Sequence, residues 1–403
     1  MAALKYWVWL ASMPALTNRS KLLLLEHFTS PEDIFYADEG AYLQVEGLQK
    51  AQAALLTDKS MERTERILME CTRKELFVLT MDDATYPSRL RNIYDPPVLL
   101  YGKGSMPLFD DEATVAVVGT RSCTPYGVSA AEQLGYEMAK SGVIVVSGLA
   151  KGIDAAAHRG ALRAGGFTAA VLGGGVDVVY PAENRRLYED IAATGVLLSE
   201  YPPMAEPEGW HFPARNRIIS GLSLGTVVVE AAEHSGALIT ANTALEQGRE
   251  VFAVPGPINA PASKGCNRLI REGAGLVGCG WDVLEEYQNR YPHRLKHNSE
   301  ELPPMPEGSE EKIKPAKAAE KIQEAPALPV LDLAKNEEGL TDDQLCIVQV
   351  LTTDQPILVD DVAEITGLPV RRVLSALTVL EIDGFACEQG ARCFVRTVEI
   401  KKE

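Results

Sequence analysis

The chain has 403 residues, of which 46% are apolar, with 39 Lys and Arg against 56 Asp and Glu. It is therefore longer than one ordinary domain and apolar enough to bury a sizeable core, which excludes a wholly disordered or fibrous chain. The net charge of −17 argues against broad nonspecific binding to nucleic acid. Residues 113–290 carry only −4 of this charge, however, so the sequence leaves room for a local basic site there.

The seven cysteines are scattered, and none forms a Cys-x-x-Cys pair or lies in a cluster of histidines. Neither a disulfide framework nor a zinc site is indicated, and this pattern fits the reducing cytoplasm. No apolar stretch approaches the about 20 residues that cross a bilayer. We therefore expect a cytoplasmic protein that has no metal site and no membrane partner.

The first 75 residues show helical spacing of apolar side chains, as at residues 22–25 and 55–56. They predict a small helical domain, of the SAM or helix-hairpin-helix kind, over residues 1–75. Proline-containing segments at 85–87 and 95–97 disfavour a helix after it. We expect residues 76–112 to form an extended bridge.

Six short β-branched runs recur between residues 113 and 277, and their ends lie 25 to 31 residues apart. They are Thr114–Val118, Val143–Val146, Thr168–Leu172, Val196–Leu198, Thr226–Val229 and Glu250–Val254. The spacing fits βα units with a crossover helix between parallel strands, and continuous runs are typical of strands covered on both faces. The sequence thus predicts an α/β fold with a doubly wound parallel sheet over residues 113–290.

Residues 296–330 contain six Pro, seven Glu and no aromatic residue, a composition that buries too little apolar surface to offset the entropy of ordering. We predict a flexible linker over 291–335. Helical patterns at 341–351, 359–366 and 369–383 and a hairpin-like end at 385–398 predict a winged helix over 336–403. This module either reads duplex DNA through Arg371 and Arg372 or docks a protein, and its acidic surroundings leave both alternatives open.

Glycines and cations follow the first three strands of the predicted sheet, at the edge where an open α/β sheet places its ligand crevice. These loops carry Gly119, Thr120 and Arg121, then Ser147, Gly148, Lys151 and Gly152, and finally Gly173 and Gly174. Glycine lets the backbone approach a ligand, and amides at a following helix start attract phosphate. A tight βα turn explains any single loop, but three converging loops with two cations favour a phosphate site.

Residues 210–220 combine aromatic, amide and cationic side chains that can bind phosphates and stack a base. The candidates are Phe212, Arg215, Asn216 and Arg217, and Lys264 adds a cation in a later polar loop. For each residue alone the alternative is structural, with Phe212 in the core and the arginines paired with Glu200 or Glu230. Stacking on such a cationic track contributes about 1–3 kcal/mol per base to single-strand binding.

Three other chemistries lack their signatures. The first strand turn has no Gly-x-Gly-x-x-Gly and the chain has no Walker-type phosphate loop, so neither a dinucleotide cofactor nor triphosphate hydrolysis is expected. A Gly-x-Ser-x-Gly match at 221–225 precedes a strand instead of following one, which excludes a nucleophile elbow. Asp154 and His158 can share a helix face, but a carboxylate at a helix start with a hydrogen-bonded histidine is the commoner arrangement.

Five ordered motifs between residues 113 and 277 resemble the family of the DNA-processing protein DprA, also called Smf. They are Ser147–His158, Gly173–Asn184 with its Gly-Gly-Gly-x-Asp-x-x-Tyr-Pro-x-x-Asn pattern, Phe212–Ser220, Ser235–Ala241 and Arg249–Gly256. The modules on either side are also similar to those of longer relatives. The resemblance implies an extended Rossmann-like domain that binds single-stranded DNA without known catalysis and without a cofactor.

The resemblance further implies a homodimer that protects incoming DNA and delivers it to the recombinase RecA during natural transformation, with single-stranded DNA-binding protein as a further candidate partner. On this reading Arg121 anchors phosphate, while the 147–152 and 173–175 loops line the pocket. Phe212, Arg215 and Arg217 extend it, and Asn184, Asn216 and Lys264 complete the set.

This chain departs from the family pattern at two positions. Where some relatives carry lysine, it has Ala182 and Ala214. Arg185, Arg186 or Lys264 would compensate for the missing charges.

A second hypothesis from a different class is an enzyme, a nucleotide-processing hydrolase on a related Rossmann-like scaffold. It rests on the Gly-Thr-x-x-x-Glu stretch at 225–230, which would make Glu230 the catalytic acid. The leading hypothesis is a DNA-binding mediator without catalysis.

Overall fold

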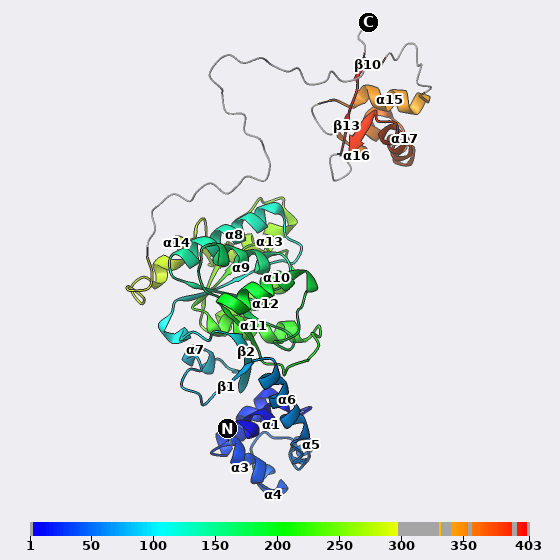
Figure 1. Ribbon diagram of the computed structural model, residues 1–403. Helices are drawn as coiled ribbons and strands as arrows, with labels where there is room; N and C mark the ends of the chain where they lie inside the picture. The colour runs from blue at the N-terminus through cyan, green and yellow to red at the C-terminus, as the bar shows by residue number, and fades with distance from the viewer. Residues whose placement is uncertain (1–2, 297–329, 332–339, 354–356, 389–392, 401–403) are drawn as a thin grey trace. The chain divides into compact units, whose positions relative to one another are not determined.

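The computed structural model describes residues 3–296, 330–331, 340–353, 357–388 and 393–400. The chain divides into two compact units, residues 1–303 and 304–403 (Figure 1). Most of the predicted linker, at 297–329 and 332–335, lies outside the described residues. Within the described ranges, none of the helices is both long enough and apolar enough to span a bilayer.

Six helices precede the sheet in the first unit (Figure 1). They are α1 (Leu4–Ser12), α2 (Asn18–His27), α3 (Pro31–Tyr36), α4 (Glu39–Tyr42), α5 (Lys50–Leu55) and α6 (Glu62–Arg73). Side-chain caps set several starts: the Thr17 hydroxyl accepts from the N–H of Ser20, and Ser30 caps α3 in the same way. Trp9 and Leu10 lie in a core formed by these helices, whereas Trp7 packs against side chains of the sheet.

The central sheet has nine strands in the order β1-β2-β6-β5-β4-β3-β7-β8-β9. Its parallel part consists of β3 (Thr114–Val118), β4 (Ile144–Ser147), β5 (Thr168–Val171), β6 (Val196–Ser199), β7 (Gly225–Val228), β8 (Glu250–Ala253) and β9 (Gly275–Leu276). The first six of these lie within one residue of the six predicted runs. The predicted α/β fold with a doubly wound parallel sheet is confirmed.

Two further strands lie in the segment that the sequence predicted as an extended bridge. β1 (Phe77–Thr80) pairs antiparallel with β2 (Leu99–Gly104), and β2 pairs antiparallel with β6, so the bridge widens the sheet. The proline signals lie in the connection between the strands, around helix α7 (Ser88–Arg91). A Cβ on Gly102 of β2 would lie 2.0 Å from the ring of Phe77, so a larger residue there would displace that ring.

Helices cover both faces of the sheet. They are α8 (Pro125–Lys140), α9 (Ile153–Arg163), α10 (Arg185–Thr194), α11 (His211–Leu222), α12 (Gly236–Glu246), α13 (Lys264–Arg271) and α14 (Gly280–Leu284). Val115 and Val117 of β3 pack in one core with α8 and α9, whereas Ala116 and Val118 pack in another with α11 and α12. Successive side chains of a strand point to opposite faces, so burial of both faces explains the continuous apolar runs.

The order of the strands reverses beside β3, which lies between β4 and β7. The loops that follow these strands therefore diverge to opposite faces and leave a crevice at the carboxyl edge of the sheet. This topology brings the predicted glycine loops to one edge.

Among the described residues of the C-terminal unit are three helices and an antiparallel strand pair, as expected for a winged helix. Its elements are β10 (Val330–Leu331), α15 (Asp342–Val350), β11 (Ile357–Leu358), α16 (Val359–Thr366), α17 (Val370–Ile382), β12 (Ala386–Glu388), β13 (Cys393–Arg396) and β14 (Glu399–Ile400). Gly367 ends α16 with φ of +66°, the left-handed conformation that glycine favours at this place. Arg371 is exposed, and Arg372 donates to Asp343 over 2.8 and 2.9 Å.

Candidate nucleic-acid interface

Two adjoining cavities lie at the carboxyl edge of the sheet. The central cavity, of about 890 Å³, is lined by the loops after β3 and β7 and by the starts of α11 and α12. The side cavity, of about 90 Å³, lies over the loops after β4 and β5. Arg121, Tyr180 and Phe212 line both, so the two cavities form one continuous cleft.

Most of the predicted site residues line this cleft. The central cavity takes Gly119, Thr120, Arg121, Phe212, Arg215, Asn216 and Lys264, and the side cavity adds Gly148, Lys151, Gly173 and Gly174. Ser147, Gly152, Asn184 and Arg217 line neither cavity. The strand ends thus bring the glycine loops together, as the sequence predicted.

Arg121 and two aromatic rings form the part of the cleft best suited to a nucleic acid. The Arg121 guanidinium lies 4.8 Å from the ring centroid of Phe212, which in turn lies 5.6 Å from the ring of Tyr180. Gly173 permits this arrangement, because a Cβ there would lie 2.9 Å from the Phe212 ring. Arg121 is exposed and makes no ion pair among the described residues, so its charge is available to a phosphate.

Arg215 lines the cleft but is only 4% exposed and serves as a brace. Its Nη1 donates to the carbonyl of Gly148 over 2.8 Å and to that of Val171, which ties the β4 loop to the end of β5. Burial lowers the pKa of Arg215 to about 10, against the favourable charge of Asp154. Nε and Nη1 of Arg215 thus brace the fold, whereas no hydrogen bond within the described residues engages its Nη2, so the contact of Arg215 with phosphate stays a prediction.

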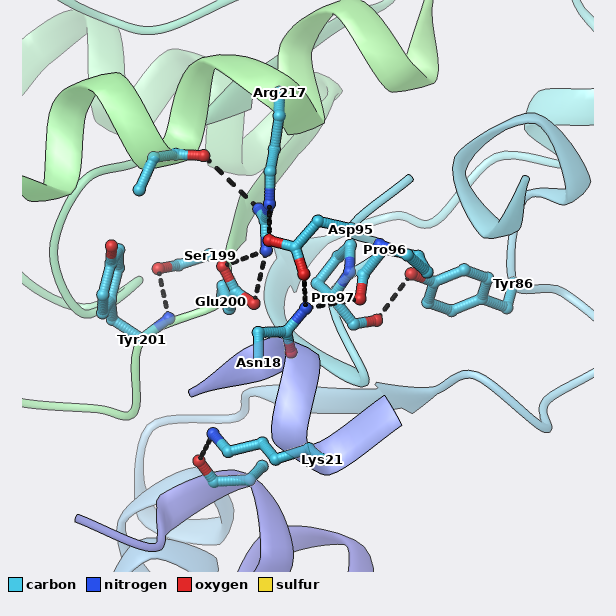
Figure 2. Close-up of polar contacts among 12 residues, drawn as sticks. Asn18, Lys21, Tyr86, Asp95, Pro96, Pro97, Ser199, Glu200, Tyr201 and Arg217 are labelled. Atoms are coloured by element: carbon cyan, nitrogen blue, oxygen red, sulfur yellow. Dashed lines mark hydrogen bonds and ion pairs between the residues drawn. The ribbon is translucent and has the colours of Figure 1, made fainter. Parts of the chain in front are cut away.

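Arg217 lies outside the cleft, which corrects the prediction that it extends the phosphate site. Its Nη2 donates to both carboxylate oxygens of Glu200 over 2.8 Å, and its Nε donates to Asp95 over 3.0 Å (Figure 2). Burial disfavours this charge, but Glu200 and Asp95 outweigh it and raise the pKa of Arg217. The sequence analysis gave an ion pair between Arg217 and Glu200 as the structural alternative, and the structure contains that pair.

Asp95 connects the cluster of Arg217, Glu200 and Asp95 to the N-terminal helices. Asn18 of α2 donates from Nδ2 to Asp95 and to the carbonyl of Pro96, each over 2.8 Å (Figure 2). Arg217 therefore joins α11 to the segment between β1 and β2 and, through Asp95, to α2. The cluster holds the helical segment against the sheet.

Three other predicted residues stabilise the loops at the strand ends through internal contacts. Ser147 is fully buried, and its hydroxyl donates to the carbonyl of Val117 over 2.6 Å. Gly152 has φ of +79° and packs against the carbonyl of Thr120, where a Cβ would lie 2.5 Å away. Asn184 donates to the carbonyl of Leu149 over 2.9 Å. They hold the cleft in shape and leave contact with a ligand to their neighbours.

Lys151 lines the side cavity and pairs with Glu183, whose carboxylate lies 2.6 Å from its Nζ. Both side chains are more than half exposed, so this pair contributes little to stability and exchanges readily for another anion. Of the three cations that could compensate for Ala182 and Ala214, Lys264 lines the cleft, whereas Arg185 and Arg186 line neither cavity.

Asp154 and His158 each take part in hydrogen bonds within the fold. Asp154 accepts from the N–H of Gly148 over 3.1 Å. The Thr168 hydroxyl donates to the carbonyl of Val145, so His158 Nδ1 must donate to that hydroxyl over 2.7 Å. Burial lowers the pKa of His158 to about 3, so the ring stays neutral at physiological pH.

Glu230, the acid of the hydrolase hypothesis, is also engaged in the fold. It is 2% exposed and accepts from the N–H and the hydroxyl of Thr124 over 2.9 and 2.6 Å. It lines neither cavity of the cleft. Its bonds to Thr124 fix the turn that starts α8.

The sequence analysis missed Tyr180, although it lies within the Gly173–Asn184 motif. The tyrosine is 47% exposed, and its ring forms a wall common to both cavities. It also missed the start of α12, where Ser235 and Gly236 line the central cavity. The sequence could have indicated both sites, because Tyr180 follows β5 and the start of α12 follows β7, and the carboxyl ends of these parallel strands lie at the same edge of the sheet.

Comparisons with known proteins agree with this fold and motif set. Residues 77–288, more than half of the chain, match the family model described as DNA recombination-mediator protein A. The chain belongs to the DprA family of DNA processing proteins. Residues 331–391 match the DprA winged helix domain, so the predicted C-terminal module is confirmed.

Individual DprA-family proteins are similar over most of their length. The DNA processing protein DprA of Bacillus subtilis is 44% identical over 56% of this chain and 76% of its own length. The protein Smf of Synechocystis is 35% identical over 93% of this chain and 94% of its own. The X-ray structure of DprA from Streptococcus pneumoniae is 41% identical, covers 70% of this chain and 97% of that chain, and superposes with a TM-score of 0.62.

Proposed function

We propose that the cleft binds single-stranded DNA. The observation that carries this proposal is the position of Arg121, which is exposed, lies 4.8 Å from the Phe212 ring centroid and lines both cavities. The guanidinium can hold a backbone phosphate while Phe212 and Tyr180 offer ring faces to unstacked bases. Duplex DNA keeps its base faces covered, so a stacking cleft of this kind favours a single strand.

The family to which the chain belongs supports the cellular role that we propose. Its description as a recombination mediator fits a homodimer that protects incoming single-stranded DNA and transfers it to RecA during natural transformation. In this role the protein acts by binding and without catalysis, alongside single-stranded DNA-binding protein. The engagement of Glu230 and His158 in internal hydrogen bonds supports a binding function over hydrolysis.

The substitution Arg121→Glu tests this function. We expect the affinity for single-stranded DNA to fall more than fivefold at about 0.1 M salt. Because one phosphate contact is lost, the slope of log K against the logarithm of the salt concentration should become less negative by about 0.7. The same variant should fail to stimulate RecA assembly on single strands. Fluorescence anisotropy with a labelled oligothymidylate measures the affinity.

Arg66→Glu is the matched control, since Arg66 is exposed on α6 and undergoes the same charge change far from the cleft residues in sequence. Wild-type affinity in the Arg121 variant would show that the cleft is not the DNA site. A loss shared equally by both variants would point to net charge alone.

A further inference from the structure

We propose that the DNA strand continues beyond the cleft over helix α13, where Lys264, Arg268 and Arg271 hold successive backbone phosphates. This inference rests on the proposed function and gives the bound strand a direction. It assigns a phosphate track to a helix that the family motifs in this sequence do not include.

The track is continuous with the cleft. A third hollow, the outer cavity, of about 370 Å³, is lined by Glu233, Ile258, Lys264, Asn267, Arg268 and Arg271. Lys264 and Glu233 line both this hollow and the central cavity. A strand that leaves the central cavity beside Lys264 therefore enters the outer cavity directly.

The three cavities follow the order of the strands. The side cavity lies over the ends of β5 and β4, the central cavity over β3 and β7, and the outer cavity beside the loop that follows β8. Neighbouring strands lie about 4.8 Å apart, so the path from β5 to β8 spans roughly 19 Å along the carboxyl edge. An extended polymer fits this row, whereas a mononucleotide would fill only one cavity.

The geometry of α13 presents its cations on one side. Lys264, Arg268 and Arg271 are at positions i, i+4 and i+7 of the helix, a spacing that places them along a single face. At 1.5 Å per residue this face extends about 10 Å. Three cations over that length suit the repeating charges of a sugar-phosphate backbone.

These charges are largely free to bind an anion. Lys264 and Arg271 are exposed, and neither side chain has a hydrogen bond or ion pair within the described part of the chain. Arg268 Nε lies 3.7 Å from a carboxylate oxygen of Glu272, beyond hydrogen-bond distance, and the side chain as a whole is 36% exposed. A phosphate would therefore compete with Glu272 for the exposed part of this guanidinium.

An apolar side chain completes the outer cavity. Ile258 is 92% exposed and lines the hollow beside the cations. It offers an apolar surface to a sugar or base whose phosphates lie on α13. Among the described residues that line the outer cavity, three are cationic, namely Lys264, Arg268 and Arg271, and one is acidic, Glu233.

The test compares two oligothymidylates with a double variant, Arg268→Gln/Arg271→Gln, in the full chain. A strand of about 3 nucleotides stays within the cleft, because even stacked nucleotides advance about 3.4 Å each, and one of about 16 extends over α13. We expect the variant to bind the short strand within twofold of wild type. For the long strand we expect about fivefold weaker binding per phosphate at 0.1 M salt, hence roughly 25-fold, and a salt slope smaller by about 1.4.

Arg63→Gln/Arg66→Gln on α6 is the matched control, since both arginines are exposed and the net charge changes equally. It should bind both strands as wild type does. The charge-preserving variant Arg268→Lys/Arg271→Lys should recover most of the long-strand affinity, which separates loss of charge from loss of folding.

Two other results would overturn the track. If the Gln variant binds both strands as wild type does while Arg121→Glu loses both, the cleft is the DNA site but α13 is not part of it. If light scattering shows a changed oligomeric mass, the α13 face is a contact between copies of the chain. Equal losses for both strands would place α13 within the cleft itself and would also contradict an extension.

Discussion

Three arginines near the carboxyl edge of the sheet have three different roles. Arg121 is exposed beside Phe212, Arg215 is buried as a donor to backbone carbonyls, and Arg217 is held by Glu200 and Asp95. The amino-acid type is the same in each case, and the partner decides the role. A guanidinium already paired with two carboxylates gains little from a phosphate.

Replacing Arg217 with methionine should therefore destabilise the fold and leave the cleft intact. The substitution removes the cation that Glu200 and Asp95 bind directly and leaves Lys21 as the nearby positive charge, and removing one partner of a buried pair commonly costs about 3–5 kcal/mol. Because both acids are partly exposed, we expect a loss of about 2 kcal/mol in the free energy of unfolding, measured by urea denaturation.

Adding Glu200→Gln to the Arg217→Met variant should restore part of the stability, since it removes one of the two repelling charges. Below the unfolding transition, single-strand affinity should match wild type. If Arg217→Met lost as much DNA affinity as Arg121→Glu, Arg217 would be part of the DNA-binding site after all.

The elements around the cleft depend on glycines at specific close approaches. A Cβ on Gly148 would lie 2.2 Å from Nη1 of Arg215. In Gly148→Ala the guanidinium must move and lose its bonds to the carbonyls of Gly148 and Val171. We expect a cost of about 2–3 kcal/mol, from crowding and from a buried donor left unpaired.

Gly209→Ala provides the comparison within the same cleft, because a Cβ there meets no atom within 4 Å. Thermal unfolding of the two variants should show a clear drop in midpoint for Gly148→Ala and almost none for Gly209→Ala. Similar midpoints would mean that Arg215 relaxes freely and does not brace the β4 loop.

The sequence predicted the parallel strands well because burial on both faces leaves an uninterrupted apolar run in each. It missed β1 and β2, since prolines dominate the segment between them and β2 ends in a glycine-containing stretch. It located the cleft because loops after parallel strands share an edge. It could not assign the arginines, because Asp95 lies 122 residues from Arg217 and pairs with it only through the fold.

On the scale of the whole molecule, charge is distributed unevenly. Residues 297–403 carry −10 of the net −17, although they make up about a quarter of the chain. The proposed DNA track, by contrast, brings Arg121, Lys264 and α13 to one edge of the sheet. We expect the acidic chain tethered to this unit to compete with DNA for these cations, and we expect the competition to weaken as salt screens the charges.

A chain truncated after Lys296 should therefore bind single-stranded DNA more tightly than the full chain at about 0.05 M salt, with the difference vanishing near 0.3 M as the Debye length shortens. Adding Arg121→Glu to the truncated chain should abolish the gain, because the competition is for the cleft. Weaker binding after truncation would have the opposite meaning: the winged helix, through the exposed Arg371, would then contribute DNA contacts that exceed the repulsion of its acidic surroundings.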